Sequence, residues 1–282
     1  MKRLALALLL ALSTPAAADA LYFSAIPDDD ETRLIARFSK VADYLSAQLG
    51  VEVKYVPVKD YAASIAAFRN DQIQLAWFGG LTGVQARAAV PGARAIAQGE
   101  EDQAFVTYFI ANAATGLQPS DDFPAAIAGH SFTFGAETST SGRLMPEYWI
   151  REKTGQAPSD LFSQVGYSGD HGQTLRLVAS GAYDVGALNY TVYDKAVAEN
   201  APEVANTRVL WQTPSYPDYN WTIRGDVDAR FGEGFADRVQ AALVGMTDPA
   251  LLDSFPRKAF VPASNDLYAP IEKTARDLDI ID

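Results

Sequence analysis

The chain has 282 residues, of which 48% are hydrophobic and 21% are charged, and its formal net charge is −12. These values are typical of a folded protein of one or two domains, and the acidic balance argues against nucleic acid as a partner. The chain has no cysteine, which excludes disulfides, thiolate metal sites and cysteine nucleophiles.

The first 20 residues have the three parts of a secretory signal peptide. Met1-Lys2-Arg3 is basic, residues 4–12 are an unbroken run of Leu and Ala, and small residues follow. This run is too short for a helix that spans a bilayer, which takes about 20 residues. We expect cleavage after Ala20, with Ala18 as second choice. An exported chain without disulfides indicates the periplasm.

From residue 21 onward, strand patterns alternate with helix patterns. We expect strands at 21–26, 51–56, 73–78, 93–97, 105–111, 132–134, 162–165, 183–188 and 209–212. One helix is expected between its cap Asp30 and Gly50, and a second at 61–69 after its cap Asp60. Further helices are expected at about 81–89, from the Ser/Thr stretch to about 154, and at 172–180, 191–200, 227–246, 249–254 and 271–278.

This alternation predicts an α/β protein with two lobes, each a mixed, mostly parallel sheet flanked by helices. Residues 21–109 and 224–282 are assigned to lobe 1, and residues 110–223 to lobe 2. The linking strands are expected near 107–112 and 219–224. Ligands of such proteins bind between the lobes, at the carboxyl ends of strands and the amino ends of helices.

One hydroxyl-rich stretch is predicted to lie in that inter-lobe cleft. It comprises Ser139, Thr140, Ser141 and Gly142, and it precedes an amphipathic segment. Hydroxyl residues cap helix starts, and a helix start binds oxyanions through its free N–H groups and dipole. The alternative is an ordinary N-cap without a ligand.

Three other strand-to-helix junctions are expected to face the same cleft. They contribute Tyr61, the turn formed by Trp77, Phe78, Gly79 and Gly80, and His171 at a helix start. A phenol, close backbone N–H groups and an imidazole can each donate to an oxyanion. The alternatives are a surface Tyr, core packing of the aromatic pair and an incidental His.

The sequence favours binding over catalysis. Ser141 and His171 with Asp170 or Asp184 could be drawn as a triad, but no Gly-x-Ser-x-Gly elbow is present. His130 and His171 are far apart in sequence, which argues against a metal site. Neither a Walker-type loop nor a Gly-x-Gly-x-x-Gly motif after a strand occurs, which argues against nucleotide binding. We therefore expect no enzyme activity, no metal and no cofactor.

Five short motifs together resemble the phosphonate/phosphite class of periplasmic substrate-binding proteins that feed ABC importers. In chain order they span residues 24–27, 56–61, 74–80, 139–142 with Pro146, and 168–171. The resemblance implies a type II fold that closes on its ligand by hinge motion. It implies that Ser139-Thr140-Ser141 holds the anionic head group, helped by Tyr61, the Trp77–Phe78 turn and His171. The implied partners are an ABC permease and ATPase, with the receptor a monomer.

The chain departs from this family at Asn189 and Tyr190. Relatives that bind aminophosphonates carry an acidic residue there, and a neutral amide and phenol would not offset the burial of an ammonium group. We therefore expect a compact oxyanion without an amine, such as phosphite or a small alkylphosphonate. Residues 216–221 resemble proteins assigned to selenate uptake, so a selenate-like anion also fits.

Two other functions stay open at the level of sequence. A sensory receptor for a membrane histidine kinase would use the same ligand site with a different partner surface. An exported hydrolase on a two-lobed scaffold would turn over a phosphonate or phosphate ester.

Overall fold

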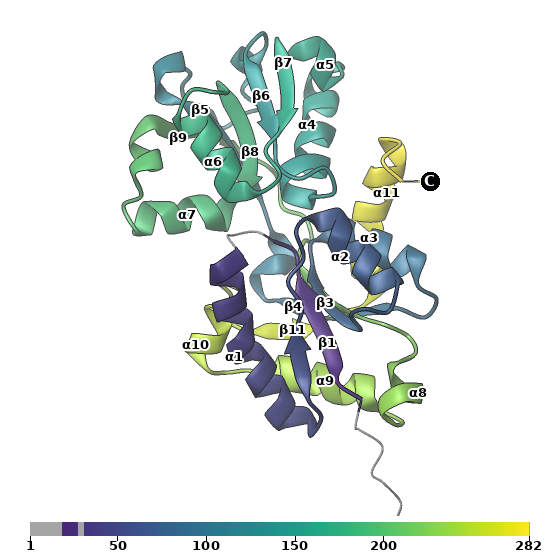
Figure 1. Ribbon diagram of the computed structural model, residues 1–282. Helices are drawn as coiled ribbons and strands as arrows, with labels where there is room; N and C mark the ends of the chain where they lie inside the picture. The colour runs from purple at the N-terminus through teal and green to yellow at the C-terminus, as the bar shows by residue number, and fades with distance from the viewer. Residues whose placement is uncertain (1–18, 28–30, 282) are drawn as a thin grey trace, which may run out of the picture.

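The computed structural model describes residues 19–27 and 31–281, which form two lobes, each built on its own sheet (Figure 1). Most of the expected signal peptide, residues 1–20, and the expected cap Asp30 lie outside the described residues. Among the described helices, none is long and apolar enough to cross a membrane.

The first sheet has six strands in the order β11-β4-β10-β3-β1-β2. Strand β1 is parallel to β2 and β3, whereas β10 is antiparallel to β3 and β4, and β11 to β4. The strands are β1 (Leu21–Ala25), β2 (Val53–Tyr55), β3 (Leu75–Phe78), β4 (Arg94–Gly99), β10 (Asn220–Ile223) and β11 (Phe260–Pro262). Its helices are α1 (Glu31–Leu49), α2 (Tyr61–Arg69), α3 (Gly80–Ala89), α8 (Val227–Phe231), α9 (Phe235–Val244), α10 (Pro249–Leu252) and α11 (Ala269–Asp277).

The second sheet has five strands in the order β7-β6-β8-β5-β9. Only β5 runs against its neighbours β8 and β9, so the expected mixed, mostly parallel character is confirmed. The strands are β5 (Thr107–Asn112), β6 (Ser131–Phe134), β7 (Gln164–Tyr167), β8 (Val185–Asn189) and β9 (Thr207–Gln212). The helices are α4 (Met145–Thr154), α5 (Pro158–Leu161), α6 (His171–Ala179) and α7 (Tyr190–Ala198).

Short helical turns fill several connections. The 3₁₀ turns are η1 (Glu101–Ala104), η2 (Ala113–Thr115), η3 (Ala125–Ile127), η5 (Pro202–Asn206) and η6 (Asn265–Tyr268). The turn η4 (Thr140–Leu144) is instead a π-helical turn that leads directly into α4.

Two neighbouring segments carry the chain between the sheets. Phe105, just before β5, and Tyr216, just before β10, exchange backbone hydrogen bonds of 2.8 and 3.0 Å. The expected boundary after residue 109 falls inside β5, and residues 220–223, assigned to lobe 2, form β10 of the first sheet. Nothing in the sequence pattern marks the crossing point, because both segments continue directly into the strands that follow them.

Each lobe has an aromatic core. In the first, Trp77 packs against Trp221 and Phe255 with ring centroids 5.5 and 5.3 Å apart. In the second, Phe132 stacks on Phe162 at 4.6 Å, and Phe109 lies 5.4 Å from Trp211. Burial of such large rings supplies much of the free energy that stabilises each lobe.

The C-terminal part differs from the expected long helix at 227–246. It forms α8 and α9, separated by Gly232 and Gly234, both of which have positive φ, 100° and 72°. These angles interrupt a right-handed helix, although the apolar spacing continues across the break. Strand β11 was not expected from the sequence, because three residues carry too little pattern.

Candidate functional site

The Ser/Thr stretch lies at the start of the helix formed by η4 and α4. Ser139 is the N-cap, and its Oγ accepts a hydrogen bond from the Gly142 N–H at 3.0 Å. Ser139, Thr140 and Ser141 are 1–2% exposed. The N–H groups of Thr140 and Ser141 precede the first bonds within the helix and are therefore available to a ligand. The result is an enclosed helix start that carries several donors and the positive end of the helix dipole.

The first lobe contacts this helix start through α3. The Leu81 N–H donates to Thr140 Oγ1 at 3.0 Å, and Thr82 Oγ1 donates to the Thr138 carbonyl at 2.9 Å. A Cβ on Gly79 would lie 3.3 Å from Thr140 Oγ1, and one on Gly80 equally close. The two glycines thus let the start of α3 approach the start of η4 closely.

His171 and Tyr61 meet across the two lobes. His171, the first residue of α6, is fully buried, and its Nε2 lies 3.5 Å from the Tyr61 hydroxyl at the start of α2. His171 Nδ1 accepts a hydrogen bond from the Asn189 N–H at 3.3 Å, which assigns the ring proton to Nε2. Burial lowers the pKa of His171 to about 4. The imidazole is therefore a neutral donor at physiological pH.

His171 also lies beside the Ser/Thr stretch. A Cβ added to Gly142 would be 3.1 Å from His171 Cε1. The starts of α2, α3, η4 and α6 thus converge on one region, which we call the interlobe site. It comprises Tyr61, Gly79–Leu81, Ser139–Gly142 and His171.

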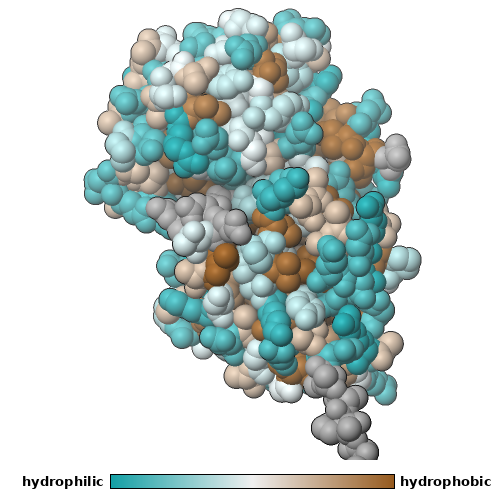
Figure 2. All heavy atoms as spheres, in the orientation of Figure 1, coloured by the Kyte–Doolittle hydropathy of each residue, from teal (hydrophilic) through white to brown (hydrophobic). Residues whose placement is uncertain are grey.

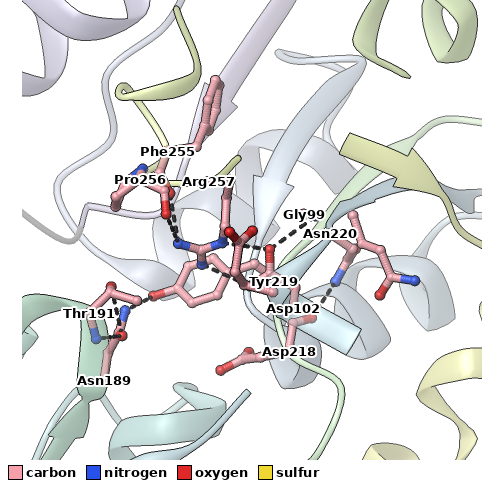
Figure 3. Close-up of polar contacts among 12 residues, drawn as sticks. Gly99, Asp102, Asn189, Thr191, Asp218, Tyr219, Asn220, Phe255, Pro256 and Arg257 are labelled. Atoms are coloured by element: carbon pink, nitrogen blue, oxygen red, sulfur yellow. Dashed lines mark hydrogen bonds and ion pairs between the residues drawn. The ribbon is translucent and has the colours of Figure 1, made fainter. Parts of the chain in front are cut away.

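Asn189 is the last residue of β8, and its N–H bonds His171 of the interlobe site, while Tyr190 is the first residue of α7. Figure 3 shows the side-chain contacts of Asn189. Asn189 caps α7, because its Oδ1 accepts from the Thr191 N–H at 2.8 Å, and its Nδ2 donates to the Tyr219 hydroxyl at 3.1 Å. The Tyr190 ring packs against Phe105 with centroids 4.9 Å apart. Asn189 is thus held in place by bonds to both lobes.

Trp77 and Phe78 contribute mainly to the core of the first lobe. Trp77 stacks on Tyr219 at 5.5 Å, and Phe78 packs edge-on against Phe68 at 5.6 Å. Both are at most 3% exposed. The part of this turn that reaches the interlobe site is the backbone at Gly79 and Gly80.

Three further residues border the interlobe site and were not among the expected ones. Thr107 Oγ1 donates to the Ser141 carbonyl at 2.9 Å and lies 2.5 Å from the Tyr216 hydroxyl. Asp218 Oδ1 accepts from the Gly80 N–H at 2.8 Å. In the sequence, residues 216–221 carry only a family pattern, because nothing local indicates that this segment crosses beside the helix start.

A buried ion pair lies against the ring of Tyr219 (Figure 3). Arg257 donates to Asp102 through two nitrogens, at 2.7 and 2.8 Å, and both side chains are at most 2% exposed. The Arg257 guanidinium lies 5.1 Å from the centre of the Tyr219 ring. The paired carboxylate balances the charge of Arg257 within the lobe.

The arrangement does not form the triads considered from the sequence. The Nδ1 of His171 faces a backbone N–H, Asp170 Oδ1 caps α6 through the Gln173 N–H at 2.7 Å, and Asp184 bonds Ser131. Neither aspartate therefore orients His171 as the third member of a triad would. Among the described residues, no group of three His, Cys, Asp or Glu side chains is placed to hold a metal ion.

Comparison with known proteins identifies the family to which this chain belongs. Residues 23–268 match the family model for the periplasmic phosphonate substrate-binding protein of ABC transporters. The chain belongs to this family and is a substrate-binding component of an ABC importer, with the two-lobed fold of periplasmic binding proteins.

Individual relatives sharpen this placement. The chain is 39% identical over 264 residues to a probable ABC transporter phosphite-binding protein, PhnD1, of Prochlorococcus marinus, and the match covers 91% of this chain and 89% of the relative. It is 26% identical to the phosphonates-binding periplasmic protein of Escherichia coli, over 70% of this chain and 59% of that protein. The structure of PhnD1 with methylphosphonate superposes with a TM-score of 0.88, covering 93% of this chain and 99% of that one, at 38% identity.

Proposed function

We propose that this protein is a periplasmic receptor for hydrogen phosphonate (phosphite) or a small alkylphosphonate, which it delivers to an ABC permease and ATPase. The observation that carries the proposal is the buried helix start at Ser139–Ser141, where the N–H groups of Thr140 and Ser141 precede the first bonds within the helix. Tyr61 and His171 complete a set of neutral donors around it.

This set of neutral donors can bind an anion although none of its members carries a positive charge. Hydrogen bonds to a charged group are each worth about 1.5–3 kcal/mol, because the acceptor is ionised. Several such donors in an enclosed site replace the water shell of the anion. The acidic charge of the whole chain is thereby offset locally.

The proposed ligand has no ammonium group. Asn189 and Tyr190 are neutral, and Asn189 is already engaged with Thr191 and Tyr219. The carboxylate that borders the site, Asp218, bonds Gly80 and Thr140, so an anionic head group held at Thr140 would lie beside it.

Closure of the lobes around the anion completes the proposed cycle. The bonds Leu81–Thr140 and Thr82–Thr138 join the two lobes at the helix start. The paired segments at Phe105 and Tyr216 are the proposed hinge, and they divide the mature chain into lobes at about 105 and 216. The mature receptor begins at Leu21 after cleavage, acts as a monomer and releases its ligand unchanged.

Thr140→Ala and Ser141→Ala test the proposal. Each variant should weaken binding of hydrogen phosphonate or methylphosphonate by about 1–3 kcal/mol, since each loses a hydroxyl at the helix start. Isothermal titration of mature protein measures this loss, after a thermal-shift panel of oxyanions has identified ligands.

Ser39→Ala is the control, because that hydroxyl bonds its own helix on the surface of α1. If all three variants bind like the wild type, the hydroxyls of Thr140 and Ser141 do not hold the anion. Release of a hydrolysed product would show an enzyme instead.

A further inference from the structure

A buried carboxylate with an unused oxygen borders the interlobe site. Asp218 is 1% exposed, and its Oδ1 accepts from the Gly80 N–H. Its Oδ2 is buried and has no hydrogen-bond partner among the described residues. Leaving a buried polar oxygen unpaired costs about 1–3 kcal/mol, and more if it is charged. The unpaired oxygen therefore indicates that the ligand brings a hydrogen-bond donor to it.

The place of Asp218 decides which part of a ligand it meets. A Cβ on Gly79 would lie 3.3 Å from Thr140 Oγ1 and 3.4 Å from Asp218 Oδ1, so the carboxylate and the helix start are immediate neighbours. An anion bound at Thr140 would touch Asp218. Two ionised groups in contact repel one another strongly in an enclosed site.

The charged groups around Asp218 do not relieve this repulsion. Arg257 attracts the carboxylate, but Asp102 already pairs with Arg257 and repels Asp218. Burial keeps the hydroxyls of Tyr216 and Tyr268 protonated, because it raises their pKa values well above 10. His171, across the site, is neutral above pH 4.

We propose that Asp218 and the bound anion share one proton, so that the site selects oxyanions that carry an acidic hydroxyl. A hydrogen phosphonate monoanion brings that proton and donates it to Asp218 Oδ2. A fully ionised anion such as selenate or sulfate binds only when Asp218 takes up a proton from solvent and donates it. The inference rests on the proposed function and names its ligand class.

The acidity of Asp218 agrees with this role. Burial raises the pKa of the Asp218 carboxyl to about 7, while the hydrogen bonds from Gly80 and Thr140 oppose the shift. The carboxyl therefore gains or loses its proton in the same pH range as a phosphonate-type anion, whose second pKa is about 6 in phosphorylated side chains. Within pH 6–9, both Asp218 and the ligand therefore titrate.

The test is the pH dependence of affinity in the wild type and in Asp218→Asn, by isothermal titration with phosphite and selenate between pH 6 and 9. In the wild type, both dissociation constants should rise about tenfold per pH unit above pH 8, where one proton must be supplied. The amide that this substitution introduces keeps an oxygen for Gly80 and offers a permanent N–H donor. The variant should therefore lose this dependence for selenate and bind selenate about tenfold more tightly than the wild type at pH 8.5.

Asp121→Asn is the matched control, because Asp121 is exposed in a loop of the second lobe. It should keep the wild-type pH profile. Calorimetry of the wild type in buffers of different ionisation enthalpy gives a second readout that needs no variant, and it should show uptake of about one proton per phosphite at pH 9.

Several outcomes would overturn the inference. One is parallel pH profiles for selenate in the wild type and Asp218→Asn, and another is binding at pH 9 without proton uptake. Tightest binding of 2-aminoethylphosphonate, lost in Asp218→Asn, would assign the carboxylate to an ammonium group instead. If the wild type binds none of these anions at any pH, the proposed function itself fails.

Discussion

His171 shows how a single residue is set up as a neutral donor. The Asn189 N–H occupies its Nδ1, so the Nε2 proton is directed toward Tyr61 and the interlobe site. Burial of the whole ring disfavours the imidazolium. A neutral ring keeps its donor over the full physiological pH range, whereas a surface histidine would change its charge.

The buried state of His171 should appear in the pH dependence of folding. Its pKa is about 4 in the folded chain against an ordinary 6.5, so the unfolded chain binds more protons between these pH values. Stability from this residue is present above pH 6.5 and is lost as the pH falls toward 4. In the variant His171→Gln, the side chain at this position binds no proton in this pH range. The wild type should therefore lose about 1.4 kcal/mol per pH unit relative to the variant in this window.

Urea unfolding of both proteins between pH 4 and 7 measures the difference. Comparing the two removes the contributions of other titrating groups, Asp218 included. A constant difference across the window would show that His171 is protonated in the folded protein or exposed to solvent.

At the residue scale, the sequence predicted the site residues at helix starts better than those in the segments that cross between the lobes. Helix starts leave local signals, and the structure brings Tyr61, Ser139–Ser141 and His171 together, as expected. Thr107, Tyr216 and Asp218 come from the crossing segments. Their place depends on how the lobes meet, which no local pattern encodes.

At the element scale, the π turn that precedes α4 contains Gly142, and the surrounding atoms leave no space for a side chain at this position. A Cβ on Gly142 would lie 3.0 Å from Ser139 Oγ, 3.1 Å from Gly135 Cα and 3.1 Å from His171 Cε1. The Leu144 N–H bonds the Ser139 carbonyl at 3.0 Å, which widens the first turn. Gly142 thus lets the helix start, the end of β6 and His171 approach one another.

Gly142→Ala should separate these three elements. The added methyl displaces His171 or the helix start, and overpacking of this kind costs about 1–3 kcal/mol of stability. Affinity for phosphite should fall about tenfold or more, since two donors move at once and each hydrogen bond to an ion is worth about 1.5–3 kcal/mol. Thermal unfolding and isothermal titration measure the two effects.

Gly172→Ala is the control for this prediction. Its added Cβ would meet side-chain atoms of Arg176 and Asp170 at 3.3 Å. The Arg176 side chain can move aside, and the Asp170 oxygen needs to give way only slightly at this distance. Equal losses of affinity in both variants would show that any methyl group near His171 is harmful, and not the contact at the helix start.

The elements themselves were largely predictable from the sequence. Tyr61–Arg69 has the bounds that were expected, and its cap Asp60 accepts from the Ala63 N–H at 2.7 Å. The break between α8 and α9 was missed, because positive φ at Gly232 and Gly234 is a property of the folded backbone. The π turn at 140–144 was missed for the same reason.

At the scale of the whole molecule, the interlobe site exists only where the two sheets are held together. Its donors come from helices of both lobes, and Leu81 and Thr82 of α3 close over the start of η4. On the face drawn in Figure 2, hydrophilic residues are spread over both lobes. The net charge of −12 acts against anion binding at the surface, so the proposed function requires the enclosed donors to supply the attraction.

A second place where an anion could lodge lies at the rim between the lobes. This groove is lined by Arg37 and Pro256 of the first lobe and by Arg176 and Lys195 of α6 and α7. It carries Glu199 and Glu203 as well, and it is open to solvent, so its cations are screened.

A crystal structure of the mature protein with phosphite most directly tests the claim that the start of η4 holds the anion. We expect the phosphorus within the interlobe site, with anion oxygens about 2.7–3.1 Å from the N–H groups of Thr140 and Ser141, as for charge-assisted hydrogen bonds. Density for the anion in the rim groove at Arg176 and Lys195, with the helix start occupied by water, would contradict the account.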